Sequence, residues 1–330
     1  MTSQRPTLRD VARLSGVSQI SASRVMRGAP NISDSLRARV EAAATELGYT
    51  PNRLAGGLKA RSSNLIAVVV PSMGNGVFPE VVDGIDAGLA GSGHRTVLGI
   101  TRYDAEMEAG IIRDLLSWSP TGLIVAGLEH TAPARRLLEA ARVPVIEIMD
   151  IDGVPVDRAI GFSHRGAAEA MADHLLARGY RRIGYVGAWG ERPSRSAKRR
   201  LAFEARLAAR GRPLATRRIE DAASSIMLGR QALAALLAQD PDLDAVFFAN
   251  DDLAVGGLIH CLDRGISVPG QLALAGFNGI ESLQAMPVKL TTIRTPRLDM
   301  GVAAARALME PPAGPAICDR GFELLVGDST

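Results

Sequence analysis

The stretch from Thr7 to Met26, TLRDVARLSGVSQISASRVM, decides the fold of the amino-terminal region. Thr7 is followed three residues later by Asp10, which is the pattern of a capping box at the start of a helix. Gly16 can adopt the positive φ of the turn that ends this helix. Ser18 is a good N-cap for a second helix over residues 19–26. The stretch therefore predicts two short helices joined by a tight turn.

Two helices of about eight residues each are too short to be stable alone, so a third must pack on them. The sequence predicts this third helix over residues 34–47, capped by Ser33 and closed by Gly48. Apolar residues at helical spacing supply the core that the three helices share: Val11, Ala12, Leu14, Val25, Leu36, Val40, Ala44 and Leu47. The region thus predicts a helix-turn-helix headpiece with a supporting helix, over residues 1–50.

Basic side chains are concentrated in the same region. Residues 1–61 contain ten Lys or Arg and four Asp or Glu, a net charge of +6, whereas the whole chain of 330 residues has +3. A basic module on a mildly acidic body is typical of a DNA-binding arm. On charge alone, a solvated basic face without a partner explains the asymmetry about as well.

The second helix of a helix-turn-helix lies in the major groove, where its first residues meet base edges. Here these residues include Gln19, Ile20 and Arg24. Arginine can bind guanine through two hydrogen bonds, glutamine can pair with adenine, and isoleucine can contact a thymine methyl group. Two alternatives remain open: Arg24 contacts only phosphate, or Ile20 is partly buried.

After residue 64 the pattern changes to short apolar strands that alternate with amphipathic helices. Strands are expected at residues 65–70, 95–100, 122–125, 143–148, 182–186, 245–248, 272–276 and 322–326, and helices at 79–92, 105–117, 132–141, 166–178, 197–210, 226–239 and 253–264. Such alternation predicts parallel sheets covered by helices, here in two similar lobes. Ligands bind beyond the carboxyl ends of such strands. The candidate ligand-binding residues at these ends are Pro71, Ser72, Phe78, Asp150, Asn250, Asp251, Phe277 and Asn278.

The amino-acid composition restricts the classes of protein to which the chain can belong. With 47% apolar and 22% charged residues, the chain has the composition of an ordinary soluble globular protein. Its two cysteines, Cys261 and Cys318, show no metal-ligand spacing. The longest apolar run, residues 65–70, is too short to cross a bilayer, and no signal peptide is evident. We therefore expect a cytoplasmic protein that makes no membrane contact.

Catalytic motifs find little support in the sequence. The segment 74–78, GNGVF, is not a glycine-rich phosphate loop, the five histidines lack zinc-ligand spacing, and there is no nucleophile elbow. We expect no enzyme, no cofactor and no metal site. A periplasmic sugar-binding protein would explain the body but has no use for the basic headpiece, and a sugar-modifying enzyme would need a nucleophile or cofactor loop.

Several motifs of the headpiece together are similar to those of the LacI/GalR (lactose-repressor) family of transcriptional regulators. They are TLRDVA at 7–12, GVS at 16–18, SRV at 23–25 and LGYTPN at 47–52. One departure is Ala22, where the family usually has valine, so the packing of the second helix loses methyl groups. The resemblance implies the DNA-contacting residues Thr7, Ser18, Gln19, Ile20, Ser23, Arg24, Asn52, Leu58 and Lys59.

The linker, residues 51–64, contains RLAGGLK at 53–59, which looks like the hinge helix of this family. The resemblance implies that Leu58 wedges into the minor groove with Lys59 beside it, which bends the duplex. Gly56 and Gly57 each cost about 1 kcal/mol of helix propensity relative to alanine. We therefore expect the hinge to order only on DNA; the alternative is a flexible tether with Leu58 merely exposed.

The body resembles the effector domain of the same family, which has the two-lobed fold of the type I periplasmic sugar-binding proteins. The resemblance rests on residues 250–256, 268–269, 276–278 and 290–293. It implies that the chain crosses three times between the lobes of a ligand-binding and dimerisation domain, residues 65–330. The first lobe would hold residues 65–161 and 294–315, and the second lobe 162–293 and 316–330.

The family's ligand positions fall on Phe78, Asp150, Arg199, Asn250 and Asn278, the last of which is aspartate in many relatives. The segment 191–200, ERPSRSAKRR, holds five cations, and arginines at a cleft favour an anionic ligand. We expect Arg192, Arg195 and Arg199 to bind the effector, and Lys198 and Arg200 to face solvent. His130 is expected to be a hydrogen-bonded structural residue.

Segments 75–78, 129–131, 147–150, 161–163 and 191–203 are similar to the branch of the family that regulates gluconate operons. The resemblance implies a small sugar acid, such as gluconate or a keto or phosphorylated derivative, as effector. The expected protein is a repressor that binds a pseudo-palindromic operator as a homodimer and releases it when the effector binds. No leucine heptad follows residue 326, so a dimer is expected in preference to a tetramer.

Overall fold

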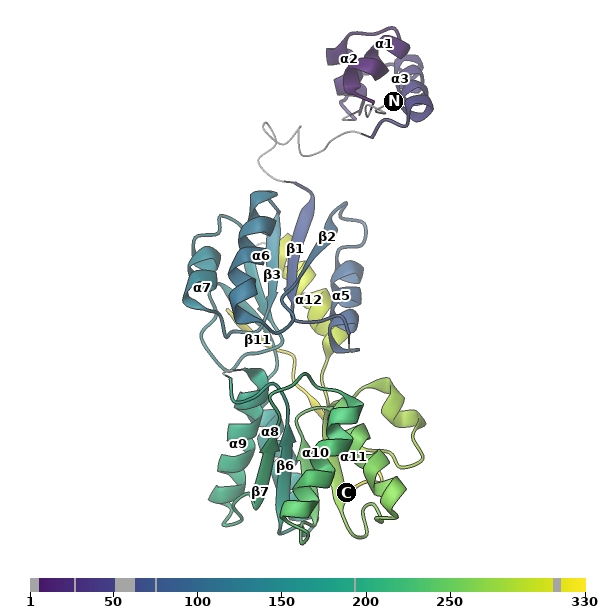
Figure 1. Cartoon of the computed structure of the whole chain (residues 1–330). Coiled ribbons are helices and arrows are strands. Elements are labelled where there is room, and N and C mark those ends of the chain that lie inside the picture. Colours follow the sequence, from purple (N-terminus) through teal and green to yellow (C-terminus); the bar gives the residue numbers. More distant parts are fainter. Residues whose placement is uncertain (1–5, 27, 51–62, 75, 193, 311–315) are drawn as a thin grey trace. The chain divides into compact units, whose positions relative to one another are not determined.

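The structure is a computed structural model that describes residues 6–26, 28–50, 63–74, 76–192, 194–310 and 316–330 (Figure 1). The chain divides into two compact units, residues 1–63 and residues 64–330. The fold class predicted from the sequence is confirmed: a helical headpiece precedes an α/β body with two sheets. Within the described residues, no helix is long and apolar enough to cross a membrane.

The described part of the first unit contains three helices: α1 (Leu8–Leu14), α2 (Gln19–Met26) and α3 (Asp34–Leu47). Gly16 and Gly48 have the positive φ values of 66° and 63° that the turns after α1 and α3 require. The three helices share the buried side chains Val11, Ala12, Ala22, Val25, Val40, Ala43 and Ala44. The prediction that Leu14 belongs to this core is wrong, because Leu14, at the last position of α1, is 46% exposed.

The second unit contains two six-stranded sheets in the described part of the chain. The first sheet is parallel throughout, in the order β11-β5-β4-β3-β1-β2. The second has the order β12-β10-β9-β8-β6-β7, with only β12 antiparallel to its neighbour among these pairs. The strands are β1 (Leu65–Val70), β2 (Arg95–Ile100), β3 (Gly122–Ala126), β4 (Val145–Ile148), β5 (Arg158–Gly161), β6 (Ile183–Gly187), β7 (Thr216–Ile219), β8 (Ala245–Phe248), β9 (Ala273–Asn278), β10 (Thr291–Arg294), β11 (Ile317–Asp319) and β12 (Glu323–Leu325).

Helices cover both faces of each sheet, as parallel strands require (Figure 1). In the first lobe, α5 (Val77–Gly88) packs on α12 (Arg297–Met309), and α6 (Ala105–Ser117) packs on α7 (Ala132–Glu139). In the second lobe, α8 (His164–Ala177) packs on α9 (Arg195–Ala209), and α10 (Ile226–Gln239) packs on α11 (Asp251–Arg264). A short 3-10 helix, η1 (Glu281–Ala285), follows β9.

The chain crosses between the lobes before α8, after β10 and before β12, and α12 packs in the first lobe. The expected start of the last segment at residue 316 differs from the structure, because β11 pairs with β5 in the first sheet. This third crossing therefore follows Asp319. β11 is only three residues long, so its sequence has no period that reveals which sheet it joins.

Four described strands of the body were not predicted: β5, β7, β10 and β11. β5 is four residues long and begins with a charged residue, and β7 reads TRRI and lies at the edge of its sheet without a buried residue. An edge strand has a partner on one side only and can remain polar, so it lacks the apolar run by which the inner strands were found.

Candidate functional site: a DNA-reading helix and a cleft between two lobes

The three residues predicted to contact base edges lie on α2. Gln19, Ile20 and Arg24 are exposed, and Ile20 is 74% exposed, although it is a large apolar side chain. Ala22 and Val25, on the opposite face, are fully buried against α1 and α3. The alternative in which Ile20 is partly buried is therefore wrong. An exposed isoleucine between polar neighbours is suited to contact a thymine methyl group in the major groove.

The predicted caps differ in detail. The backbone amide and hydroxyl of Thr7 both donate to the Asp10 carboxylate, at 3.0 and 2.7 Å, which closes the predicted capping box. Ser18 Oγ accepts from the amide of Ser21 at 3.1 Å. Ser33 precedes α3, but its side chain does not cap the helix. Thr7 and Ser18 are exposed, and Ser23 is half-buried. The predicted contacts Asn52, Leu58 and Lys59 lie outside the described residues.

Between the two lobes of the body lies an inner cavity of about 400 Å³. This volume falls in the range of small-molecule sites. Of the seven predicted effector residues, all but Asp150 line it: Phe78, Arg192, Arg195, Arg199, Asn250 and Asn278. They come from α5, the loop before α9, α9 itself, and the ends of β8 and β9. The residues predicted from the carboxyl ends of strands and those predicted from the cationic segment 191–200 therefore line the same cavity.

Arg199 is held on the floor of this cavity by neutral partners. Its Nη1 donates to His164 Nδ1 at 3.1 Å and its Nη2 to the carbonyl oxygen of Ala249 at 2.9 Å. Its guanidinium lies 4.1 Å from the ring centroid of Phe277, a cation–π contact. Its Nε is buried without a hydrogen-bond partner. Burial lowers the pKa of Arg199 to about 10, so the side chain keeps its charge at neutral pH.

His164 orients Arg199. The imidazole is 2% exposed, and its Nε2 lies 2.8 Å from the carbonyl oxygen of Met149, so Nε2 carries the proton and Nδ1 accepts from Arg199. Burial, followed by the charges of Arg199 and Arg195, holds the pKa of His164 well below its usual range. The histidine is therefore neutral, and it links the first lobe at Met149 to the second at Arg199.

Arg195 supplies a second cation with unused hydrogen-bonding capacity. Its guanidinium lies 5.6 Å from the centroid of the Phe78 ring, and its Nη1 is buried without a hydrogen-bond partner. A buried donor without an acceptor is costly. Two arginines of one helix therefore line the cavity, and each has a nitrogen without a hydrogen-bond acceptor.

Lys198 does not face solvent, contrary to the prediction. Its ammonium group contacts the carboxylates of Glu129 and Asp150, the latter at 2.5 Å, and so ties α9 to the first lobe. The cause is burial: Asp150 is 0% exposed and needs a cation beside it, and the lysine stem on α9 reaches it. Asp150 is accordingly engaged with Lys198 and with the amide of Asp152, and does not line the cavity.

The prediction that Arg200 faces solvent is also wrong. Arg200 is 7% exposed and forms ion pairs with Glu191 at 2.6 Å and Glu204 at 3.1 Å. Glu204 lies one turn further along α9, and Glu191 precedes the helix, so both carboxylates meet the guanidinium on one side.

The two asparagines of the cavity have distinct surroundings. Asn250 caps α11, where its Oδ1 accepts from the amide of Leu253 at 3.1 Å, and it exchanges hydrogen bonds with Ser224. Asn278 has a φ of 125°, rare for a residue other than glycine, and its carbonyl oxygen accepts from Arg297. Asp251 is buried and accepts a hydrogen bond from the hydroxyl of Thr292 at 2.7 Å, which is a structural role.

His130 is hydrogen-bonded, as predicted. Its Nδ1 lies 3.0 Å from Glu108 and its Nε2 lies 3.1 Å from Glu147, and the side chain is 1% exposed. Burial opposes its charge, but hydrogen bonds to Glu108 and Glu147 raise the pKa of His130 to about 9. A buried imidazolium thus joins α6, the β3–α7 loop and β4. Within the described residues, no group of three or more His, Cys, Asp or Glu side chains is placed to hold a metal ion.

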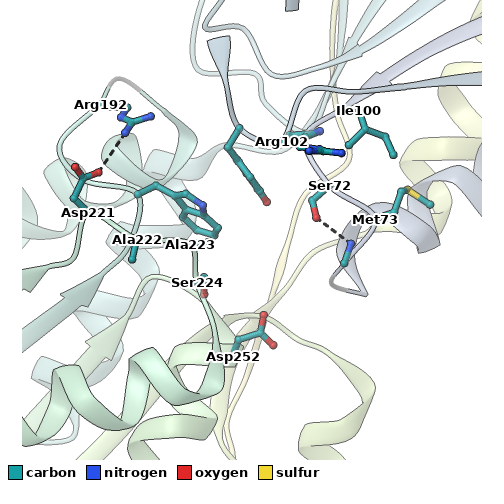
Figure 2. A pocket seen from close by; sticks show the side chains of 14 residues that line it. Ser72, Met73, Ile100, Arg102, Arg192, Asp221, Ala222, Ala223, Ser224 and Asp252 are labelled. Carbon is teal, nitrogen blue, oxygen red and sulfur yellow. Dashed lines mark hydrogen bonds and ion pairs between the residues drawn. The ribbon is translucent and has the colours of Figure 1, made fainter. Parts of the chain in front are cut away.

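An outer cavity of about 610 Å³ adjoins the inner one and shares four lining residues with it, Pro71, Tyr103, Trp189 and Arg192. Figure 2 shows Arg192 beside Asp221 on one side of the outer cavity and Arg102 on the other. Arg192 Nη2 donates to Asp221 at 3.3 Å, and both side chains are more than two-thirds exposed. Arg192 is therefore a residue of the rim, unlike Arg195 and Arg199.

Several cavity residues were missed by the sequence reading, among them Tyr103, Glu108, Met149, His164 and Trp189. Tyr103 follows β2 and Trp189 follows β6. Because ligands bind beyond the carboxyl ends of parallel strands, both residues were predictable from their positions. His164 and Glu108 belong to helices of the opposite lobes, and nothing in their spacing indicates that they reach a shared cavity.

The fold and the site together define a class: a DNA-binding regulator whose headpiece is attached to a periplasmic-binding-protein-like ligand domain. Comparison with protein families agrees. Residues 7–52 match the model "Bacterial regulatory proteins, lacI family", and residues 172–318 match "Periplasmic binding protein-like domain". The chain belongs to the LacI family of bacterial transcriptional regulators.

Individual relatives point to one branch of that family. The chain is 40% identical to the HTH-type transcriptional regulator GntR of Pseudomonas aeruginosa, over 100% of this chain and 97% of that protein. It is 36% identical to the GntR of Escherichia coli K12 over 100% of both. These relatives are transcriptional regulators, and the chain is a DNA-binding regulator of the same type and not an enzyme.

Solved structures share the whole architecture. A LacI-family regulator from Silicibacter pomeroyi has a TM-score of 0.93 and 44% identity, and the match covers 98% of this chain and 99% of that one. The lac repressor dimer bound to operator and the anti-inducer ONPF has a TM-score of 0.82 and 27% identity, and the match covers 99% of each.

Proposed function

We propose that this regulator binds a pseudo-palindromic operator as a homodimer and releases it when a small sugar acid, such as gluconate or a close derivative, enters the inner cavity. The DNA contacts are Gln19, Ile20 and Arg24 on base edges, with Thr7, Ser18 and Ser23 around them. The proposed minor-groove contacts are Asn52, Leu58 and Lys59. The effector contacts are Phe78, Arg192, Arg195, Arg199, Asn250 and Asn278.

The observation that carries the effector proposal is Arg199. It is 8% exposed, and no carboxylate in the described part of the chain forms an ion pair with it. Burying an unpaired charge is costly, and we infer that a ligand supplies the counter-charge. Arg199 Nε and Arg195 Nη1 have no hydrogen-bond acceptor in the described structure, and guanidinium groups are suited to carboxylates.

Charged groups of both signs surround the cavity. Lys198 is bound by Glu129 and Asp150. Arg195 and Arg199 line the cavity, as do the acidic residues Asp104, Glu106 and Glu108. Polar groups such as Asn250, Asn278 and Ser196 line the same space and are suited to hydroxyl groups. Two arginines beside several polar side chains favour a small acid that carries hydroxyl groups, such as a sugar acid.

The dimer proposal rests on the likeness to the lac repressor, whose structure is a dimer bound to operator. A two-fold dimer places two copies of α2 on two half-sites, so the operator would have matching symmetry. Because the effector and the operator prefer different arrangements of the body, each weakens the binding of the other, typically by about 1–3 kcal/mol.

A mobility-shift experiment on the full chain tests this function. A duplex is first selected from a pool of palindromes with randomised half-sites. Gluconate, ketogluconates, 6-phosphogluconate and uncharged glucose are then titrated into the complex. We expect gluconate to release the duplex and glucose to leave it bound. If no palindrome is shifted, the operator proposal is wrong; if none of the acids changes the shift, the effector proposal is wrong.

A further inference from the structure

Two aromatic side chains from opposite lobes meet at the boundary between the inner and outer cavities. Tyr103 follows β2 in the first lobe, and Trp189 follows β6 in the second. Their ring centroids are 4.6 Å apart with 32° between the ring planes. Both residues line both cavities. We call this pair the aromatic partition.

The backbone holds both rings in unusual places. Tyr103 and Trp189 each have a φ of 61°, a left-handed conformation that bulky residues seldom adopt and that costs of order 1–3 kcal/mol. Hydrogen bonds beside each residue fix it: the amide of Asp104 donates to Thr101 at 2.9 Å, and the amide of Trp189 donates to Ala222 at 2.9 Å. Such strain on both sides of one contact indicates that the position of the rings matters for the site.

The partition separates spaces of different chemistry. The inner cavity, about 400 Å³, is lined by Arg195 and Arg199. The outer cavity, about 610 Å³, is lined by Arg102 and by the Arg192–Asp221 pair at the solvent side (Figure 2). If a ligand binds Arg195 and Arg199 with its carboxylate, its opposite end points toward Tyr103 and Trp189. Beyond these two rings lies the outer cavity.

We propose that Tyr103 and Trp189 set the length of the effector: they confine it to a single sugar acid and exclude acids that carry a second sugar. The inference rests on the proposed function, since it takes the carboxylate to be bound by Arg195 and Arg199. Removing one ring joins the two cavities, and a second sugar unit can then occupy the outer one.

Calorimetric titration of the full chain tests this with two acids, gluconate and lactobionate, which is gluconate that carries a galactose. We expect the wild type to bind gluconate at least about 30-fold more tightly than lactobionate, and Trp189→Ala to reduce this ratio to about threefold or less. Tyr103→Ala should act in the same direction. The matched control is Trp118→Ala, because Trp118 is the chain's other tryptophan, is 43% exposed and ends α6 away from both cavities.

The outcomes separate this inference from the proposed function. Melting temperatures first establish that Trp189→Ala and Tyr103→Ala are folded. If the wild type binds gluconate and both variants keep its selectivity for gluconate over lactobionate, the partition does not set ligand length. A wild type that binds both acids equally well also contradicts it.

If the wild type binds neither acid, the proposed function fails and a second measurement decides on the partition. In Trp118→Phe, Trp189 is the sole tryptophan, and Tyr103→Ala should raise the acrylamide quenching of its fluorescence at least about twofold, because the ring that covers it is gone. Unchanged quenching would show that the two rings do not close the passage.

Discussion

The ammonium nitrogen of Lys198 lies 2.5 Å from Asp150 Oδ2, and this contact joins α9 of the second lobe to the end of β4 in the first. Asp150 is fully buried, and Lys198 also contacts Glu129. One cation between two carboxylates is therefore one of the contacts that join the two lobes. An effector that changes the distance between the lobes must act on this ion pair.

Lys198→Gln should destabilise the body. The substitution leaves two carboxylates close together, one of them buried, and we expect a loss of about 2–3 kcal/mol in the free energy of unfolding. Urea unfolding followed by circular dichroism measures it. The matched control is Arg135→Gln, which breaks the exposed pair with Glu139 and should cost less than about 1 kcal/mol. Equal effects of the two variants would show that the Lys198 contacts are no stronger than a surface pair.

Arg24→Ala should relax specificity at one base pair of each half-site. A guanine bound through two hydrogen bonds is worth about 1–3 kcal/mol of discrimination, and Arg24 is exposed on the reading helix. Anisotropy titrations against a set of single-base operator variants measure it. Arg13→Ala, on α1 and 80% exposed, is the control for general loss of positive charge. A uniform loss of affinity over all sequences would mean that Arg24 contacts only phosphate.

His130 should make the stability of the body depend on pH. Its pKa is raised from 6.5 to about 9 in the folded chain, so the stabilisation is complete below pH 6.5 and is lost as the pH rises through 9. In His130→Gln this contribution is absent. The stability difference between wild type and variant should therefore shrink by about 2–3 kcal/mol between pH 6 and pH 9.5, as measured by urea unfolding. A difference that stays constant over that range would mean that the histidine is not charged between its two glutamates.

The parts of the fold that the sequence predicted are those with a strong local signal. The capping pattern at Thr7 and the glycine at 16 locate the headpiece helices, because both act on the nearest turn of backbone. Inner strands such as 65–70 are found because they are buried on both faces and read as apolar runs. The edge strand β7 has no such run and was missed.

The candidate site was predicted where one segment carries the chemistry, as with Arg195 and Arg199 on α9. It was not predictable where chemistry arises from the meeting of two lobes. Lys198 reads as a solvated lysine until the fold brings Asp150 and Glu129 to it, and the Tyr103–Trp189 contact joins residues that are 86 positions apart in the sequence. Such pairings depend on tertiary structure and leave no local periodicity.

In the proposed function, an anion bound at Arg199 lowers the affinity of the headpiece for DNA. Anisotropy of a labelled operator duplex, titrated with gluconate, tests it most directly. The wild type should release the duplex as gluconate is added. Arg199→Ala should bind the duplex with unchanged affinity and fail to release it, whereas Arg206→Ala, a control on the same helix that is paired with Asp173, should respond as the wild type does. Normal release by Arg199→Ala would contradict the account.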